Sequence, residues 1–243
     1  MSRKALRRVL LCFMAVALVR VLGQESERAT GGGGMVKVDP DAMPLVALTF
    51  DDGPRRDTTG PLLDGLAQRE APATFFLVGE RIPGSEDLVA RMKAEGHQIG
   101  IHTFNHVMVT ELTKEEFDVQ VGETRALVER VVGSGDYWLR PPYGILNDSV
   151  VQWANGPLIL WSVDPEDWKD HNVDRIVSSV VGRVKDGDII LMHDIYPESV
   201  EAALRIVDTL QDRGYSFVTV EQLMALRQAT PVAGERYTAF PPK

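Results

Sequence analysis

Short apolar runs alternate along this chain with longer segments whose apolar residues recur every three or four positions. Runs such as 73–79 and 188–192 have the length and composition of buried strands. Thr113 and Glu116 form a capping box, the pair that opens many helices. The pattern predicts strands at 45–50, 73–79, 98–102, 137–140, 158–163, 188–192 and 217–220, helices at 58–68, 86–95, 114–131, 147–154, 173–184, 197–213 and 221–227, and an irregular tail at 230–243.

About seven strands that alternate with helices predict an α/β fold with a parallel sheet, either a barrel or a doubly wound sheet. Polar residues fall at the carboxyl ends of five separate strands; they are Asp51 and Asp52, His102, Arg140, Asp164 and His193. The carboxyl rim of a barrel carries the active site, whereas a doubly wound sheet concentrates its site at one switch point. The five strand ends therefore favour a closed or nearly closed barrel.

The N-terminal segment differs from the rest of the chain. Residues 1–23 combine a basic start with an apolar run, which is typical of a secretory signal peptide, and the run is short for a membrane span. An uncleaved membrane anchor is the alternative. A glycine-rich linker at 24–42 leads into one globular domain at 43–229. We expect an exported protein that is secreted, bound to the cell wall or anchored outside the membrane.

Composition narrows the functional classes. The formal net charge is −9, which disfavours a nucleic-acid-binding protein because such proteins rely on basic patches. The single cysteine, Cys12, excludes a disulfide framework and a cysteine metal site. Nothing in the sequence indicates a protein partner, and contact with a membrane is expected only through 1–23 if this segment stays uncleaved.

The two adjacent carboxylates that end the first strand are the first candidate for chemistry. Like charges at close range raise each other's pKa, so Asp51 and Asp52 need a reason to coexist. A metal ion beside one carboxylate removes that conflict and leaves the other free to act as a base.

His102 and His106 have a spacing at which two imidazoles share one face of a helical turn and can bind one metal. The alternative is that one histidine caps a turn and the other faces solvent. Asp52 adds weight to the metal interpretation, because two histidines and one carboxylate leave a coordination position open, as in catalytic zinc sites.

Three further residues have a functional and a structural interpretation. His193 ends an apolar strand, and this position is consistent either with a histidine that transfers protons near neutral pH or with a purely structural histidine. Arg140, followed by two prolines, either orients a rim carboxylate or lies solvated in a rigid turn. Trp168 in an acidic loop forms either a sugar-stacking wall or a cap on the barrel.

Five motifs in order resemble those of the polysaccharide deacetylases, the NodB-homology enzymes of carbohydrate esterase family four. They are TFDDG at 49–53, HTFNH at 102–106, RPPY at 140–143, DPEDW at 164–168 and LMH at 191–193. The resemblance covers about residues 44–227. It implies a distorted (β/α) barrel, similar to a TIM barrel. It also implies a divalent metal, which we expect to be zinc, with cobalt or another divalent ion as alternatives.

The resemblance also implies a role for each motif residue. Asp52, His102 and His106 would be the metal ligands. Asp51 would be the general base, with Arg140 as its ion-pair partner, and His193 the general acid, oriented by Asp167. The backbone N–H of Tyr143 would stabilise the oxyanion, and Trp168 and Leu191 would line the pocket for the acetyl methyl group.

The leading hypothesis is an enzyme that removes N-acetyl groups from N-acetylglucosamine units of an acetylated glycan, with peptidoglycan first and chitin oligomers second. An esterase acting on acetylxylan or another O-acetylated polysaccharide would use the same residues. A glycan-binding module without catalysis and a small-molecule amidohydrolase are further alternatives.

Overall fold

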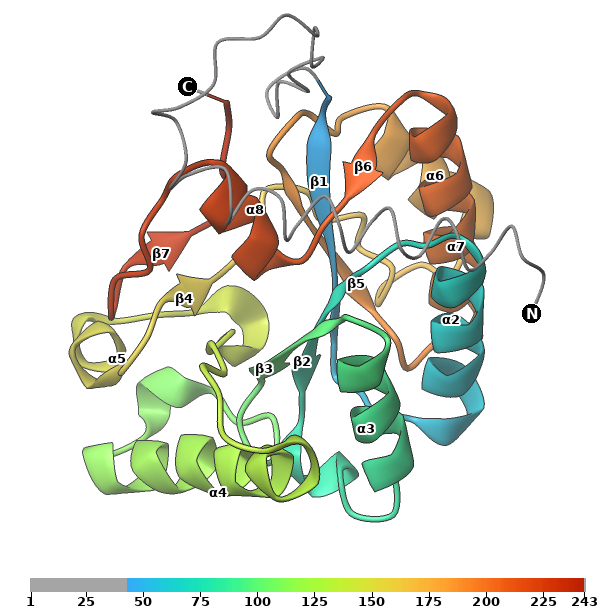
Figure 1. Cartoon of the computed structure of the whole chain (residues 1–243). Coiled ribbons are helices and arrows are strands. Elements are labelled where there is room, and N and C mark those ends of the chain that lie inside the picture. The colour runs from blue at the N-terminus through green and yellow to red at the C-terminus, as the bar shows by residue number, and fades with distance from the viewer. Residues whose placement is uncertain (1–42, 243) are drawn as a thin grey trace, which may run out of the picture. The chain divides into compact units, whose positions relative to one another are not determined.

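The computed structural model describes residues 43–242, and its strands and helices alternate as the sequence predicts (Figure 1). The strands are β1 (Leu45–Asp51), β2 (Thr74–Leu77), β3 (Gln98–Ile101), β4 (Leu158–Ile159), β5 (Ile189–His193), β6 (Ser216–Phe217) and β7 (Arg236–Tyr237). The helices are α2 (Arg56–Gln68), α3 (Glu86–Ala94), α4 (Lys114–Val132), α5 (Asp148–Trp153), α6 (Val173–Val181), α7 (Pro197–Asp212) and α8 (Val220–Leu226).

Parallel strands form a distorted barrel, which confirms the predicted fold class. The order β3-β2-β1-β5 makes its main wall, and β6 pairs with the start of β1. Single bridges close the other side: Leu139 links Ile101 to Leu158, and Val163 pairs with Ile190. The strands predicted at 137–140 and 158–163 are therefore shorter than expected, because that wall is held by isolated bridges rather than by ladders.

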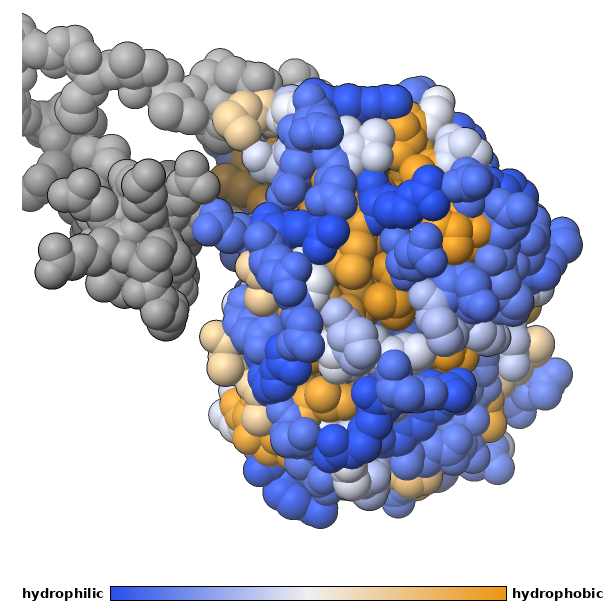
Figure 2. All heavy atoms as spheres, turned by 90° about the vertical axis from the view of Figure 1, so that its right-hand side faces the viewer, coloured by the Kyte–Doolittle hydropathy of each residue, from blue (hydrophilic) through white to orange (hydrophobic). Residues whose placement is uncertain are grey.

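Alternation along the strands divides the apolar residues into two layers. Residues such as Leu48, Phe50 and Ile190 face outward and pack under the helices, including Leu62 and Leu66 of α2. Figure 2, which views the side of α2 and α7, shows that the surface over this layer is mainly hydrophilic, with hydrophobic residues visible between.

The inward-facing residues fill the barrel. Ala47, Phe76 and Ile189 belong to an inner cluster that Leu223 and Met224 of α8 complete. Because α8 lies against the start of the barrel strands, apolar side chains occupy the amino-terminal part of the lumen. Polar groups are left to the carboxyl rim.

The predicted irregular tail at 230–243 was wrong over part of its length. β7 pairs in parallel with β4, Leu158 opposite Arg236, and Phe240 is buried in the inner cluster. A two-residue strand is too short to display the alternation that identifies longer strands. The predicted end of the domain at 229 thus excludes residues that pack into the barrel.

The signal peptide or anchor predicted at 1–23 and the linker predicted at 24–42 lie outside the described residues. Within 43–242, no helix has the length and apolar character needed to cross a membrane.

Candidate active site

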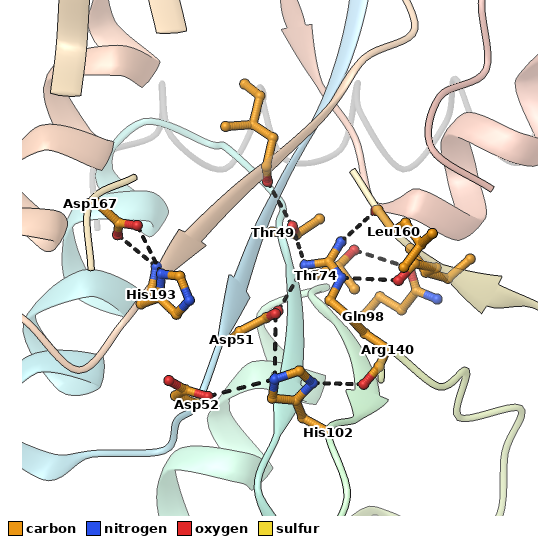
Figure 3. Close-up of polar contacts among 12 residues, drawn as sticks. Thr49, Asp51, Asp52, Thr74, Gln98, His102, Arg140, Leu160, Asp167 and His193 are labelled. Atoms are coloured by element: carbon orange, nitrogen blue, oxygen red, sulfur yellow. Dashed lines mark hydrogen bonds and ion pairs between the residues drawn. The ribbon is translucent and has the colours of Figure 1, made fainter. Parts of the chain in front are cut away.

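The ends of β1 and β5 place the first polar groups of the site side by side. Asp51, the last residue of β1, is paired with His193, the last residue of β5, and only 3% of Asp51 is exposed. Successive strand residues point to opposite faces, so Asp52 would turn away from Asp51 if the strand continued. Asp52 instead has φ 75°, and this left-handed backbone lets its carboxylate join the same rim (Figure 3).

His102 and His106 follow β3 in a loop, and the predicted helical turn is wrong. Thr103 and His106 both have positive φ, 62° and 58°, which no right-handed helix contains. The tight loop brings the two rings together nevertheless, with centroids 5.0 Å apart.

Asp52, His102 and His106, which we call the ligand triad, converge on one point. Asp52 Oδ1 lies 3.6 Å from His102 Nε2 and 3.3 Å from His106 Nε2. His102 Nδ1 donates to the Arg140 carbonyl oxygen at 2.7 Å, because a carbonyl can only accept, and this leaves Nε2 as the unprotonated nitrogen.

The ligand triad fits a divalent cation. Its ligand atoms all lie within 4.8 Å of one another, and the buried Asp52 Oδ1 has no hydrogen-bond partner among the described residues. Burial lowers the pKa of His106 despite the opposing charges of Asp52 and Asp51, and so favours the neutral imidazole that a metal requires. Two imidazoles and a carboxylate are a donor set that zinc accepts with one position open.

Arg140 is completely buried and anchors Asp51. Its Nη1 donates to Asp51 Oδ1 at 2.8 Å and to Thr49 Oγ1 at 2.7 Å, while Nε and Nη2 donate to the carbonyls of Ile159 and Leu160. The guanidinium also lies over the Phe76 ring, 4.1 Å from its centroid. Every partner fixes the orientation of the guanidinium, so this arginine is not the solvated turn residue of the alternative interpretation.

Asp167 holds His193 through two hydrogen bonds (Figure 3). Its carboxylate accepts from His193 Nδ1 at 2.8 Å and from the His193 backbone N–H at 2.9 Å. Burial lowers the pKa of His193, but the hydrogen bond and charge of Asp167, with the charges of Asp51 and Asp52, outweigh it and raise this pKa to about 9.

The residues predicted to contact substrate surround this rim. Tyr143 has φ 62° and is 57% exposed, and its ring makes a T-shaped contact with His106, with centroids 4.8 Å apart. Trp168 follows Asp167 directly and is 49% exposed. Leu191 is buried in β5 on the same face as His193, two residues further on.

Asp164 is the strand-end residue that takes a different role. Its carboxylate accepts from the Glu166 backbone N–H at 2.7 Å and stabilises the loop that carries Asp167. His171, in the same loop region, packs on Tyr196 with ring centroids 4.6 Å apart.

Two residues of this region were missed from the sequence. Thr49 accepts from Arg140 and donates to the Ile190 carbonyl, and its position two residues before Asp51 on the same strand face was a usable signal. Asp194 is buried behind the rim, where burial and the charge of Asp52 raise its pKa to about 7. No sequence signal distinguishes it from an exposed loop aspartate.

Comparisons with known proteins agree on one family. Residues 39–156 match the sequence model of the polysaccharide deacetylase family. A peptidoglycan-N-acetylmuramic acid deacetylase of Bacillus subtilis is 41% identical over 191 residues, which are 79% of this chain but 41% of that protein. This chain therefore spans less than half the length of that relative.

Two other relatives match over nearly their whole length. A peptidoglycan-N-acetylglucosamine deacetylase of Bacillus cereus is 37% identical over 193 residues, 76% of this chain and 90% of that protein. A solved family 4 acetyl xylan esterase of Clostridium thermocellum, in complex with cobalt, has a TM-score of 0.77 at 30% identity and covers 81% of this chain and 99% of its own. The chain belongs to the polysaccharide deacetylase family.

Proposed function

We propose that this protein is a metal-dependent hydrolase that removes acetyl groups from N-acetylglucosamine units of a polysaccharide, with peptidoglycan as the first substrate. The observation that carries the proposal is the ligand triad beside the Asp51–Arg140 pair, with His193 at the end of the neighbouring strand and paired with Asp167. Family membership and the activities named for the two peptidoglycan-deacetylating relatives support it.

The ligand triad would hold a divalent cation, and zinc suits its donor set best. Cobalt is supported by the related esterase solved with that ion. The chemistry supplied by such an ion is Lewis-acid polarisation of the acetyl carbonyl and a lowered pKa for water at the open position.

Asp51 would take the proton from the attacking water. Arg140 occupies its Oδ1, while Oδ2 lies 3.6 Å from His102 Nε2 and so faces the ligand triad. Because the buried guanidinium holds Oδ1, the carboxylate keeps its orientation through the reaction and Oδ2 stays free to accept the proton. A fixed orientation is the condition for efficient proton transfer.

His193 would give a proton to the departing amine. Its raised pKa, to about 9, means that the ring carries this proton at neutral pH, and because Nδ1 donates to Asp167, Nε2 is left as the donating atom. An amide nitrogen leaves only when protonated, so cleavage of the C–N bond needs such an acid.

The remaining predicted contacts would position the acetyl group. Pro141 and Pro142 have no backbone N–H, so Tyr143 carries the first main-chain donor after Arg140 and would stabilise the developing oxyanion. Trp168 and Leu191 would form an apolar wall for the methyl group.

We also propose that the enzyme acts outside the cytoplasm, on the cell wall. Support comes from the signal-like segment at 1–23 and from relatives whose named substrate is peptidoglycan.

Acetate release from N-acetylglucosamine oligomers and from peptidoglycan tests the proposal, with chelator added and zinc then restored. Native protein should release acetate only with metal present. Asp51→Asn should lose about 10²–10⁴-fold in kcat, the range for removing a general base. The variant should still bind one zinc, because Asp51 lies outside the ligand triad.

The outcomes separate the alternatives. Release from acetylxylan alone would identify an O-acetyl esterase, and release from N-acetylmuramic acid units would move the substrate toward that of the Bacillus subtilis relative. Saturable glycan binding without acetate release, with zinc bound, would refute the hydrolase. Loss of zinc from Asp51→Asn would refute its assignment as the base.

A further inference from the structure

The turn that carries Asp52 needs support, because its backbone lies in a region that non-glycine residues rarely adopt. On one side, the Asp52 carbonyl accepts from Arg81 Nη1 at 2.8 Å, and the Gly53 carbonyl accepts from the Val78 N–H at 3.0 Å. On the other side lies Asp194, a buried carboxyl group that the catalytic scheme above does not use.

Asp194 packs directly against this turn. It is 1% exposed, and its backbone N–H donates to the Asp51 carbonyl at 3.4 Å. A Cβ built on Gly53 would lie 2.3 Å from Asp194 Oδ2 and 2.5 Å from Oδ1, closer than real Cβ atoms approach. Gly53 does not have a positive φ, so the backbone conformation does not require a glycine there. The glycine is needed because it leaves room for the Asp194 carboxylate.

Thr59 of α2 connects Asp194 to the far end of the turn. The Thr59 hydroxyl donates to Asp194 Oδ2 and accepts from the Arg55 backbone N–H at 2.8 Å. Thr59 is completely buried, so water does not compete for these bonds. A continuous chain of hydrogen bonds therefore runs from Asp194, the residue after β5, through Thr59 of α2 to the backbone N–H of Arg55.

We infer that Asp194 and Thr59 are positioning residues that fix the turn at 51–55 and, through it, the metal ligand Asp52. The inference rests on the proposed metal-dependent function and adds two residues outside its assigned motifs. Asp194 contacts the turn at Asp51 and Gly53, on either side of the ligand. A displaced turn would move Asp52 Oδ1 away from His106 Nε2, now 3.3 Å distant. Removing groups that orient metal ligands typically weakens metal binding about 10–100-fold.

Zinc affinity, measured with zinc alone against a chromogenic chelator, is the direct test. Asp194→Ala and Thr59→Val should each raise the zinc Kd, Asp194→Ala by about 10–100-fold. Asp194→Asn should recover part of the loss, because its amide oxygen still accepts from Thr59. Asp186→Ala is the matched control, since Asp186 accepts from the Leu45 N–H at 2.8 Å at the opposite end of β1. It should leave the zinc Kd unchanged even where it lowers stability.

A double variant tests whether the two residues act as one chain. The zinc Kd of the double variant Asp194→Ala with Thr59→Val should be no higher than the higher of the two single-variant values, because either change breaks the same connection. Turnover at saturating zinc should show a lower kcat with an unchanged KM for the oligomer. Thr59→Val is nearly isosteric and carries the test if Asp194→Ala does not fold.

Zinc affinity within twofold of native in folded Asp194→Ala and Thr59→Val would overturn the inference. Losses that add in the double variant would overturn it as well. Native protein that binds no stoichiometric zinc would instead refute the proposed function, so the two failures are distinguishable.

Discussion

At the scale of single residues, Asp167 determines the protonation of the histidine beside it. Burial favours a neutral imidazole, yet the pKa of His193 is raised to about 9, because the Asp167 hydrogen bond and charge outweigh the burial. The bond to Nδ1 also fixes the ring, so one side chain sets both the charge and the direction of the proposed acid.

We expect Asp167→Asn to move the alkaline limb of kcat/KM to lower pH. In the native protein the protonated fraction of His193 falls as pH rises through about 9, and without the carboxylate charge that fall begins earlier. At pH 8 the variant should therefore be slower, by about 10²-fold if proton donation is largely lost. The pH–rate profile on N-acetylglucosamine oligomers measures this. The exposed neighbour Glu166, changed to Gln, is the control, and an unmoved limb in Asp167→Asn would contradict the role.

Individual site residues differed in how far the sequence could reveal them. Asp51 and His193 end apolar strands, and the pattern alone placed both on one rim. The pattern left Arg140 between two interpretations, and the role of Asp167 came only from the resemblance, because the partners of both residues lie on other elements. Asp194 was beyond reach, since its burial depends on Thr59, 135 residues away.

At the scale of elements, barrel side chains bind the start of α8. The Val220 N–H donates to Thr74 Oγ1 at 3.0 Å, and the Glu221 N–H donates to Gln98 Oε1 at 2.9 Å. Thr74 itself donates to the same Gln98 oxygen at 3.1 Å (Figure 3). The first N–H groups of a helix have no partner within it, so this network both caps α8 and attaches it to the lumen.

Thr74→Val should lower the free energy of unfolding by about 1–3 kcal/mol, because it leaves the buried Val220 N–H without its acceptor. Urea unfolding followed by circular dichroism measures the change. Thr230→Val, at an exposed threonine, is the matched control and should have little effect. Equal stability of native protein and Thr74→Val would show that α8 does not depend on this bond.

Helices and strands with a long sequence pattern were predicted more accurately than short ones. The capping box at Thr113 is confirmed, and α4 begins one residue later. The interpretation of His102 and His106 as a helical turn failed because spacing alone does not report φ, and the loop between them turns through a left-handed residue at Thr103. β7 has only two residues and so no period to detect, whereas β4 lies within the longer apolar run predicted at 158–163.

At the scale of the whole described chain, the C-terminal residues complete the barrel. The Phe240 N–H donates to the Gly187 carbonyl at 2.8 Å, and its ring stacks on Tyr237 with centroids 5.3 Å apart. Phe240 thereby belongs to the same inner cluster as Ile189 and as Leu45, which lies nearly 200 positions earlier in the sequence. The first and last described strands consequently share one core.

Phe240→Ala should destabilise the protein by about 3–5 kcal/mol, the usual cost of truncating a buried phenylalanine. Thermal and urea unfolding measure it, with Val232→Ala at a 51% exposed position as the control. A loss no larger than that of the control would mean that the C-terminal residues are dispensable for the core.

The closure of the lumen by α8 has a consequence for how products depart. Because α8 closes the amino-terminal end of the barrel, the substrate and both products would pass through the carboxyl rim. The acetyl group would enter first, with the sugar chain outermost across that mouth. Under the proposed function, the deacetylated sugar would then leave before the acetate that lies beneath it. Acetate would be the last product released and would compete with the next acetylated sugar for the emptied site.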